Sequence, residues 1–143
     1  MSIARLLAAT ALLAYGALPS LADEIVPVPA GTLVIVDGDT VKIGRQRLRL
    51  LVIDAPEIHS PRCSAERKAG LAAKARLEAL LDGQTVAIHY SGRTDPYERP
   101  LVNLEIAAGD IGTILMAEGL ALPYRGGRVE HDRRAAHWCG TIK

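Results

Sequence analysis

The sequence has few aromatic residues. It contains no Phe, one Trp and four Tyr, so aromatic side chains make up 3% of its 143 residues. A hydrophobic core must therefore be built from Leu, Ile, Val and Ala, and few rings are present to stack on nucleic-acid bases. A hydrophobic content of 49% with 23% charged residues excludes a disordered, fibrous or multi-span membrane protein. The length is typical of one domain with a short extra segment.

The first 22 residues lack charge apart from Arg5, and their order is typical of a secretory signal peptide. A largely apolar run covers residues 6–18, and a small-x-small pattern ends at Ala22. An uncleaved membrane anchor is the alternative, but the apolar stretch is shorter than the ~20 residues of a span. We therefore expect cleavage after Ala22 and export to the periplasm or the medium. A single domain at residues 23–143 would remain, with no stable membrane association.

An excess of positive charge is also lacking. The chain carries 17 Lys and Arg against 16 Asp and Glu, and loss of Arg5 with the signal peptide makes the two signs equal. Zero net charge argues against a protein that binds DNA or RNA by broad electrostatic attraction. A polyanionic substrate would require clustered arginines or a bound cation.

Alternation of apolar and polar residues dominates the rest of the chain. It predicts five strands, at residues 32–36, 40–43, 47–53, 84–90 and 101–106. One long helix is expected at 64–81, with its first residue Ser64 as the N-cap, and a short helix at 110–118. This order predicts an α+β fold that is mainly β, namely a five-stranded OB-fold barrel with one long and one short helix.

Three other segments have weaker patterns. Residues 23–30 contain two prolines and fit a leader or an edge strand. Residues 91–100 are expected to form a polar loop, and residues 130–138 a last helical turn or two.

Three polar clusters interrupt the apolar pattern. Residues 37–40 (Asp-Gly-Asp-Thr) could form a simple hairpin turn. Arg49 begins a strand that is apolar on both faces, and Asp54 and Glu57 follow its end. Buried charges must be paired or bound to metal, so an Arg49–Asp54 salt bridge is the plainest interpretation. The charged loop at 93–99 could simply be solvated.

Arg49 and Asp54 are five positions apart, so a regular strand would point them to opposite faces. If both serve one site, the chain must bend or bulge between them. We therefore expect an irregularity at residues 52–54.

The clusters match known motifs in order and spacing. The motif D-G-D-T occurs at 37–40, R-L-L-x-V-D-x-P-E corresponds to 49–57, R-T-D-x-Y-G-R corresponds to 93–99, and G-L-A occurs at 119–121. With these motifs the chain resembles the staphylococcal nuclease (thermonuclease) family over residues 31–124. The resemblance implies an OB-fold enzyme that hydrolyses DNA and RNA phosphodiesters with calcium and leaves 3′-phosphate ends.

The resemblance also implies a calcium site. Asp39 and Asp54 would supply carboxylate ligands and Ala55 its backbone carbonyl, with Asp37 and Thr40 supporting them. An all-oxygen site on loops suits Ca²⁺ better than the more exacting Mg²⁺.

The remaining roles implied by the resemblance concern the substrate. Arg49 and Arg99 would hold the phosphate, because a planar guanidinium can bind two of its oxygens at once. Glu57 would orient or deprotonate the attacking water, and Tyr97 and Tyr124 would contact the nucleic acid. We expect a monomer.

Two departures leave an alternative open. Glu98 stands where the family has Gly, so it could pair with Arg99 or disfavour a turn that needs a positive φ. The segment 58–63 is shorter than the lysine-bearing loop of the best-known member. The alternative is a non-catalytic OB-like module that binds nucleic acid or a protein.

The only two cysteines, Cys63 and Cys139, lie 76 positions apart. In an exported protein a disulfide is the expected state, and it would tie the short tail to the domain. The alternative is a zinc site that adds His59 and His137, whose spacings are poor for structural zinc. Four tail arginines could form a basic rim for nucleic acid or belong to a solvated tail: Arg125, Arg128, Arg133 and Arg134.

Overall fold

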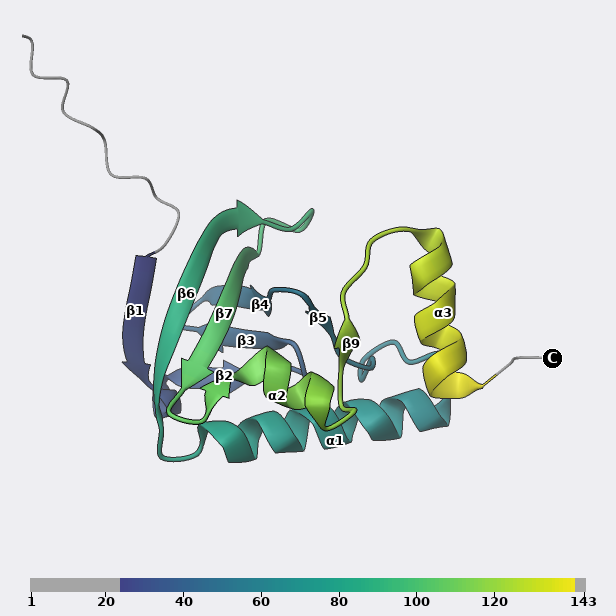
Figure 1. Cartoon of the computed structure of the whole chain (residues 1–143), viewed down its shortest axis with the longest axis horizontal. Coiled ribbons are helices and arrows are strands. Elements are labelled where there is room, and N and C mark those ends of the chain that lie inside the picture. Colours follow the sequence, from purple (N-terminus) through teal and green to yellow (C-terminus); the bar gives the residue numbers. More distant parts are fainter. Residues whose placement is uncertain (1–23, 141–143) are drawn as a thin grey trace, which may run out of the picture.

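The computed structural model describes residues 24–140, so the expected signal peptide lies outside the described residues. The main sheet curls into a half-barrel (Figure 1). In spatial order its strands are β1 (Glu24–Pro29), β6 (Thr85–Thr94), β7 (Pro100–Ile106), β4 (Gln46–Leu50), β3 (Thr40–Ile43) and β2 (Leu33–Ile35). Neighbouring strands are antiparallel except β4 and β7, which are parallel. The short strand β8 (Gly109–Asp110) pairs with β7, and β5 (Ile53–Asp54) pairs with β9 (Leu122–Pro123) in a separate ribbon.

This architecture confirms the predicted α+β fold of OB type. Each predicted strand is present, although the bounds of several differ. The strand expected at 84–90 continues as β6 to Thr94, so the first part of the expected loop is strand. Residues 24–29 form the edge strand β1, where Pro27 and Pro29 are tolerated because only β6 pairs with it.

Between residues 24 and 140, three α-helices accompany the sheet, together with a short 3₁₀ turn η1 (Ala30–Thr32). The long helix α1 (Ser64–Leu81) has the predicted bounds, and α2 (Ile111–Ala117) lies within the predicted short one. The predicted N-cap was wrong: Ser64 is already helical, and the Cys63 sulfur accepts a hydrogen bond from the Glu66 N–H at 3.3 Å. In the described part of the chain, no helix has the length and apolarity needed to cross a membrane.

The third helix, α3 (Arg128–Cys139), is longer than the turn or two expected there. It stands beside β9, and its end meets the first turn of α1 (Figure 1). A disulfide joins Cys63 to Cys139 at this point. The predicted bridge is therefore confirmed, and the zinc alternative is wrong because the bridge uses both sulfurs.

The core between the curled sheet and helices α1 and α2 is aliphatic, as the composition predicted. Its largest fully buried hydrophobic side chains come from the strands and from both helices: Val41, Leu48, Ile53, Leu77, Val86, Ile88, Val102, Leu104, Ile111 and Leu115. Of the aromatic residues, Tyr90 packs against this cluster and is only partly buried. Polar residues at the start of β3, near the end of β4 and in β5 lie next to this core: Thr40, Arg49 and Asp54.

The strand expected at 47–53 is interrupted, which confirms the predicted irregularity. Strand β4 ends at Leu50, and β5 begins at Ile53. Between them Val52 adopts a left-handed φ of 63°, which is strained for a β-branched residue. The Val52 carbonyl accepts a hydrogen bond from the Tyr124 N–H at 2.7 Å, which holds the turn in place. The turn places Arg49 and Asp54 on the same side.

Candidate active site

A pocket of about 980 Å³ opens where β3 begins, where β4 ends and beside β5. It is lined by nine of the residues predicted to form the site: Asp37, Asp39, Thr40, Arg49, Asp54, Glu57, Tyr97, Arg99 and Tyr124. Ala55 is buried next to the pocket, and its N–H donates to Asp39 Oδ2 at 2.7 Å. The structure therefore brings the predicted residues together, although they are scattered over 88 positions of sequence, from Asp37 to Tyr124.

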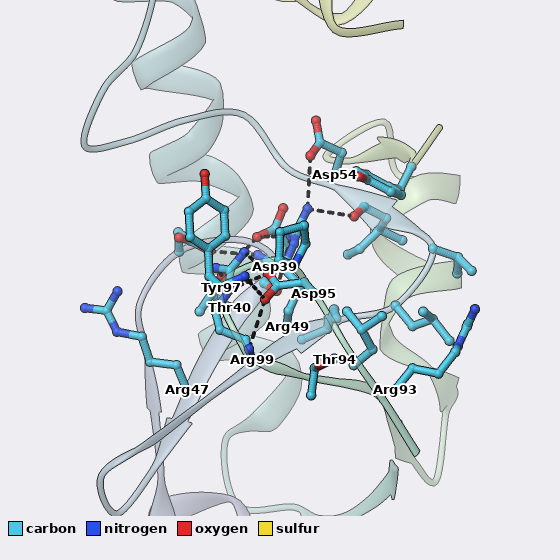
Figure 2. Close-up of a pocket in the computed structure, with 18 of the residues that line it drawn as sticks. Asp39, Thr40, Arg47, Arg49, Asp54, Arg93, Thr94, Asp95, Tyr97 and Arg99 are labelled. Atoms are coloured by element: carbon cyan, nitrogen blue, oxygen red, sulfur yellow. Dashed lines mark hydrogen bonds and ion pairs between the residues drawn. The ribbon is translucent and has the colours of Figure 1, made fainter. Parts of the chain in front are cut away.

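Arg49 is the centre of the cluster (Figure 2). Its guanidinium pairs with Asp39 and donates to Asp54 Oδ1 at 3.0 Å, and it also donates to the Ile53 carbonyl at 3.2 Å. The Arg49 side chain is only 11% exposed. Burial opposes its charge, but the adjacent Asp39 raises the pKa of Arg49, so the guanidinium remains charged.

Asp39 is buried beneath this arginine. Its Oδ1 accepts from the Thr40 hydroxyl at 3.1 Å, and its own N–H donates to Asp37 Oδ1 at 3.1 Å. Burial raises the pKa of Asp39 to about 7, and Asp37 adds to the rise while Arg49 counteracts it. Asp39 is therefore harder to ionise than an exposed aspartate, although Arg49 stabilises its charged form.

Glu57 lies at the open side of the pocket. No hydrogen bond to its carboxylate occurs among residues 24–140. Partial desolvation raises the pKa of Glu57, and the charges of Asp37 and Asp54 raise it further, against the effect of Arg49. The Glu57 carboxylate is thus accessible, and it lies close enough to Asp37 and Asp54 for their charges to raise its pKa.

Arg99 enters from the opposite wall, on the loop between β6 and β7. Asp95 fixes this loop: its Oδ1 accepts from the Tyr97 and Arg99 N–H groups, each at 2.9 Å. Its Oδ2 accepts from Arg99 Nε at 2.7 Å. A further bond, at 3.4 Å, joins Arg99 Nη1 to the Thr40 hydroxyl, so the two walls of the pocket are connected.

Glu98 adopts the positive φ that the family glycine would favour, with a value of 60°. A non-glycine residue in this region costs about 1 kcal/mol. Arg99 pairs with Asp95 and not with Glu98. The substitution therefore strains the turn without engaging the guanidinium.

The two tyrosines flank the mouth of the pocket. Tyr97 is 80% exposed, and its ring lies 5.5 Å from the Arg99 guanidinium carbon. Tyr124 is also exposed, and Arg49 and Arg134 lie 6.0 Å and 5.8 Å from its ring centre. Both rings therefore lie exposed at the pocket lining, each next to an arginine.

Four charged residues of the pocket lining were not among the predicted site residues: Arg47, Arg93, Asp95 and Arg134. Of these, Arg134 was considered only as part of a basic rim or a solvated tail. Figure 2 shows Arg47 and Arg93 extended away from the central cluster. Arg134 Nε contacts Asp54 Oδ2 at 2.5 Å. The signal for Arg134 was its place five residues before Cys139, because the predicted disulfide ties this part of the tail to the domain.

The remaining tail arginines do not line this pocket. Arg125 and Arg133 line a smaller neighbouring depression, whereas Arg128 lines neither. Of the four tail arginines, Arg134 alone lines the described active-site pocket.

The acid groups can be tested as cation ligands. Within residues 24–140 no three His, Cys, Asp or Glu side chains form a ready-made metal cluster. Asp39 and Asp54 nevertheless suit a hard cation, because both are carboxylates that line the pocket. Both now bind arginine, so a cation would have to displace or join these pairs.

The family model of staphylococcal nuclease homologues matches residues 47–138 of the chain. The match includes Arg49, Asp54, Glu57 and Arg99, whereas Asp39 lies before its start. No curated protein shows significant similarity to the chain.

Proposed function

The chain belongs to the staphylococcal nuclease homologue family, and we propose that it is an exported nuclease that hydrolyses DNA or RNA with Ca²⁺ and leaves 3′-phosphate ends. The observation that carries this proposal is the convergence of Arg49, Arg99 and Glu57 with Asp39 and Asp54 in one pocket. The disulfide is compatible with export, since such bridges persist in oxidising compartments.

The two arginines supply charge stabilisation. Attack on a phosphodiester gathers negative charge on its non-bridging oxygens, so positioned cationic donors lower the barrier. Arg49 and Arg99 come from different walls, and carboxylates hold each in place. A phosphate placed between them would meet two guanidinium groups of fixed orientation.

Charge balance supports a cation in the site. Five arginines and five carboxylates line the pocket, so it has no formal excess charge with which to attract a phosphate. A Ca²⁺ ion held by Asp39, Asp54 and the Ala55 carbonyl would neutralise charge on the phosphate oxygens. Glu57 would not be a ligand of this ion. It is accessible and close to the same carboxylates, so it could orient or deprotonate the attacking water.

Glu57 also favours an enzyme over a non-catalytic binding module. A protein that only binds nucleic acid has no need for an unpaired carboxylate next to the phosphate position, where it would repel the ligand. Glu98 does not favour the binding module either, since it leaves Arg99 unblocked.

The decisive experiment is digestion of single-stranded DNA with Ca²⁺ or with a chelator. We expect Glu57→Gln to lower kcat by about 10²–10⁴-fold, because a general base is lost. Arg49→Ala should lower it by about 10²–10³-fold. The matched control is Glu78→Gln, an exposed carboxylate on α1, which should leave the rate unchanged.

Each part of the proposal has its own contrary outcome. Equal activity of wild type, Glu57→Gln and Arg49→Ala would reject catalysis at this pocket. Activity that survives chelation would remove the calcium dependence alone. Products that prime a DNA polymerase without phosphatase treatment would contradict 3′-phosphate ends.

A further inference from the structure

Helix α3 has no buried residue, so it does not contribute to the core. It is attached at its C-terminal end by the Cys63–Cys139 disulfide. Arg62, in the segment before α1, adds a second attachment, with its Nη2 2.6 Å from His131 Nε2. A helix that is attached at two points yet adds no residue to the core requires another explanation, and the side chain that it presents to the pocket supplies one.

That side chain is Arg134. Its side chain is 15% exposed, whereas that of the preceding residue, Arg133, is 69% exposed and pairs with Glu130. Arg134 Nε contacts Asp54 Oδ2 at 2.5 Å, and Nη1 donates to the Arg125 carbonyl at 2.9 Å. The guanidinium is therefore oriented on two sides and lies at the pocket wall.

Asp54 is shared between two arginines. Its Oδ1 accepts from Arg49 and its Oδ2 contacts Arg134, so both oxygens are occupied. A Ca²⁺ ion needs carboxylate oxygens at about 2.3–2.6 Å. Arg134 and a cation would therefore compete for Asp54, and loss of this pair would free the guanidinium next to the substrate.

We propose that Arg134 is a third phosphate-binding arginine of the site, which pairs with Asp54 until a cation occupies that carboxylate and then binds the nucleic-acid backbone. This inference rests on the proposed nuclease function. It assigns α3 and its disulfide the task of placing Arg134. Arg134 would hold a phosphate on the α3 side of the pocket, next to Tyr124 and away from Arg99.

The inference predicts effects of opposite sign. Arg134→Gln removes a competitor for Asp54, so the affinity for Ca²⁺ alone should rise at least about threefold in calorimetry without nucleic acid. The same change removes a charge-assisted contact to phosphate, so the affinity for a short single-stranded oligonucleotide should fall about tenfold. Oligonucleotide binding is measured with Ca²⁺ in the Glu57→Gln background, which prevents cleavage. A merely structural role would lower both affinities.

Arg133→Gln is the matched control, because it makes the same charge change one position away on an exposed side chain. It should alter each affinity by less than about twofold. Arg134→Lys keeps the charge and should restore part of the oligonucleotide affinity, which separates charge from guanidinium geometry. Reduction of the disulfide should lower oligonucleotide affinity in the same direction as Arg134→Gln.

Two results would overturn the inference. One is a fall of both the Ca²⁺ affinity and the oligonucleotide affinity in Arg134→Gln, whatever circular dichroism shows of its fold. The other is identical Ca²⁺ and oligonucleotide affinities for Arg134→Gln and Arg133→Gln, when the wild type itself binds Ca²⁺ and cleaves DNA. Failure of the wild type itself to bind Ca²⁺ and to cleave would reject the proposed function as well.

Discussion

Two sides of the pocket each hold an arginine against Asp54, and they do so by different means. Arg49 belongs to β4, where its neighbours Leu48 and Leu50 are buried in the core. Arg134 belongs to α3, which has no buried residue and is held by a disulfide. The position of Arg49 is therefore tied to the stability of the whole domain, whereas the position of Arg134 depends on one covalent link and local contacts.

The largest expected effect is that of Arg49→Ala on both stability and activity. The change leaves buried Asp39 without its partner, so the free energy of unfolding should fall by about 3–5 kcal/mol. Arg99→Ala breaks a more exposed pair and should cost about 1 kcal/mol or less. Denaturant unfolding of the metal-free variants measures both changes in the free energy of unfolding. Equal decreases for Arg49→Ala and Arg99→Ala would contradict the expected difference between the two arginines.

The second prediction concerns the α3 side. Replacement of Cys63 and Cys139 by Ser should lower the free energy of unfolding by about 2–4 kcal/mol, since the bridge closes a long loop. Because α3 has no residue in the core, the variant should keep a folded main sheet with α1 and α2, and therefore its far-ultraviolet circular dichroism, near room temperature. Thermal unfolding under reducing and non-reducing conditions tests this. An unchanged transition would show that the bridge does not stabilise the domain.

A smaller effect is expected from Glu98→Gly. Glycine adopts a φ of 60° without a steric penalty of about 1–2 kcal/mol, but its freer unfolded chain offsets about 0.4–1 kcal/mol of this. Unfolding should therefore require about 0.5–1 kcal/mol more. Nuclease activity should stay the same or rise slightly, because Glu98 does not pair with Arg99. A Glu98→Ala variant controls for loss of charge and should not be stabilised.

The smallest effect is a shift in pH dependence. Glu57 must be ionised to act on water, so activity should fall as the pH drops through its pKa, which partial desolvation and then Asp37 raise. Asp37→Asn removes the second cause and should move this loss of activity to lower pH. Asp132→Asn, on exposed α3 surface, is the control. A shift to higher pH in Asp37→Asn would contradict the electrostatic assignment.

Local patterns were sufficient for much of the structure. Strand β3 and helix α1 have the predicted bounds, because their apolar periodicity and flanking turns agree with the packing. The break between Arg49 and Asp54 followed from strand parity together with the hypothesis that both residues serve one site. The pocket residues followed from the motif resemblance, which the family match supports as a family assignment.

Other features depend on partners that no local pattern specifies. The edge strand β1 is defined by pairing with β6, and α3 by its attachment to α1. Arg134 could not be distinguished from Arg133 in the sequence, because only the direction of α3 decides which of them reaches Asp54. The positive φ of Glu98 opposes its local preference and is imposed by the closure of the β6–β7 loop.

The disulfide has a consequence for biosynthesis. Its two cysteines are 76 positions apart, and the second lies at the end of α3. The strands of the main sheet and α1 precede Cys139 in the chain, so they can pack before the bridge forms. The last wall of the pocket is held in place only once an oxidant has joined Cys63 to Cys139.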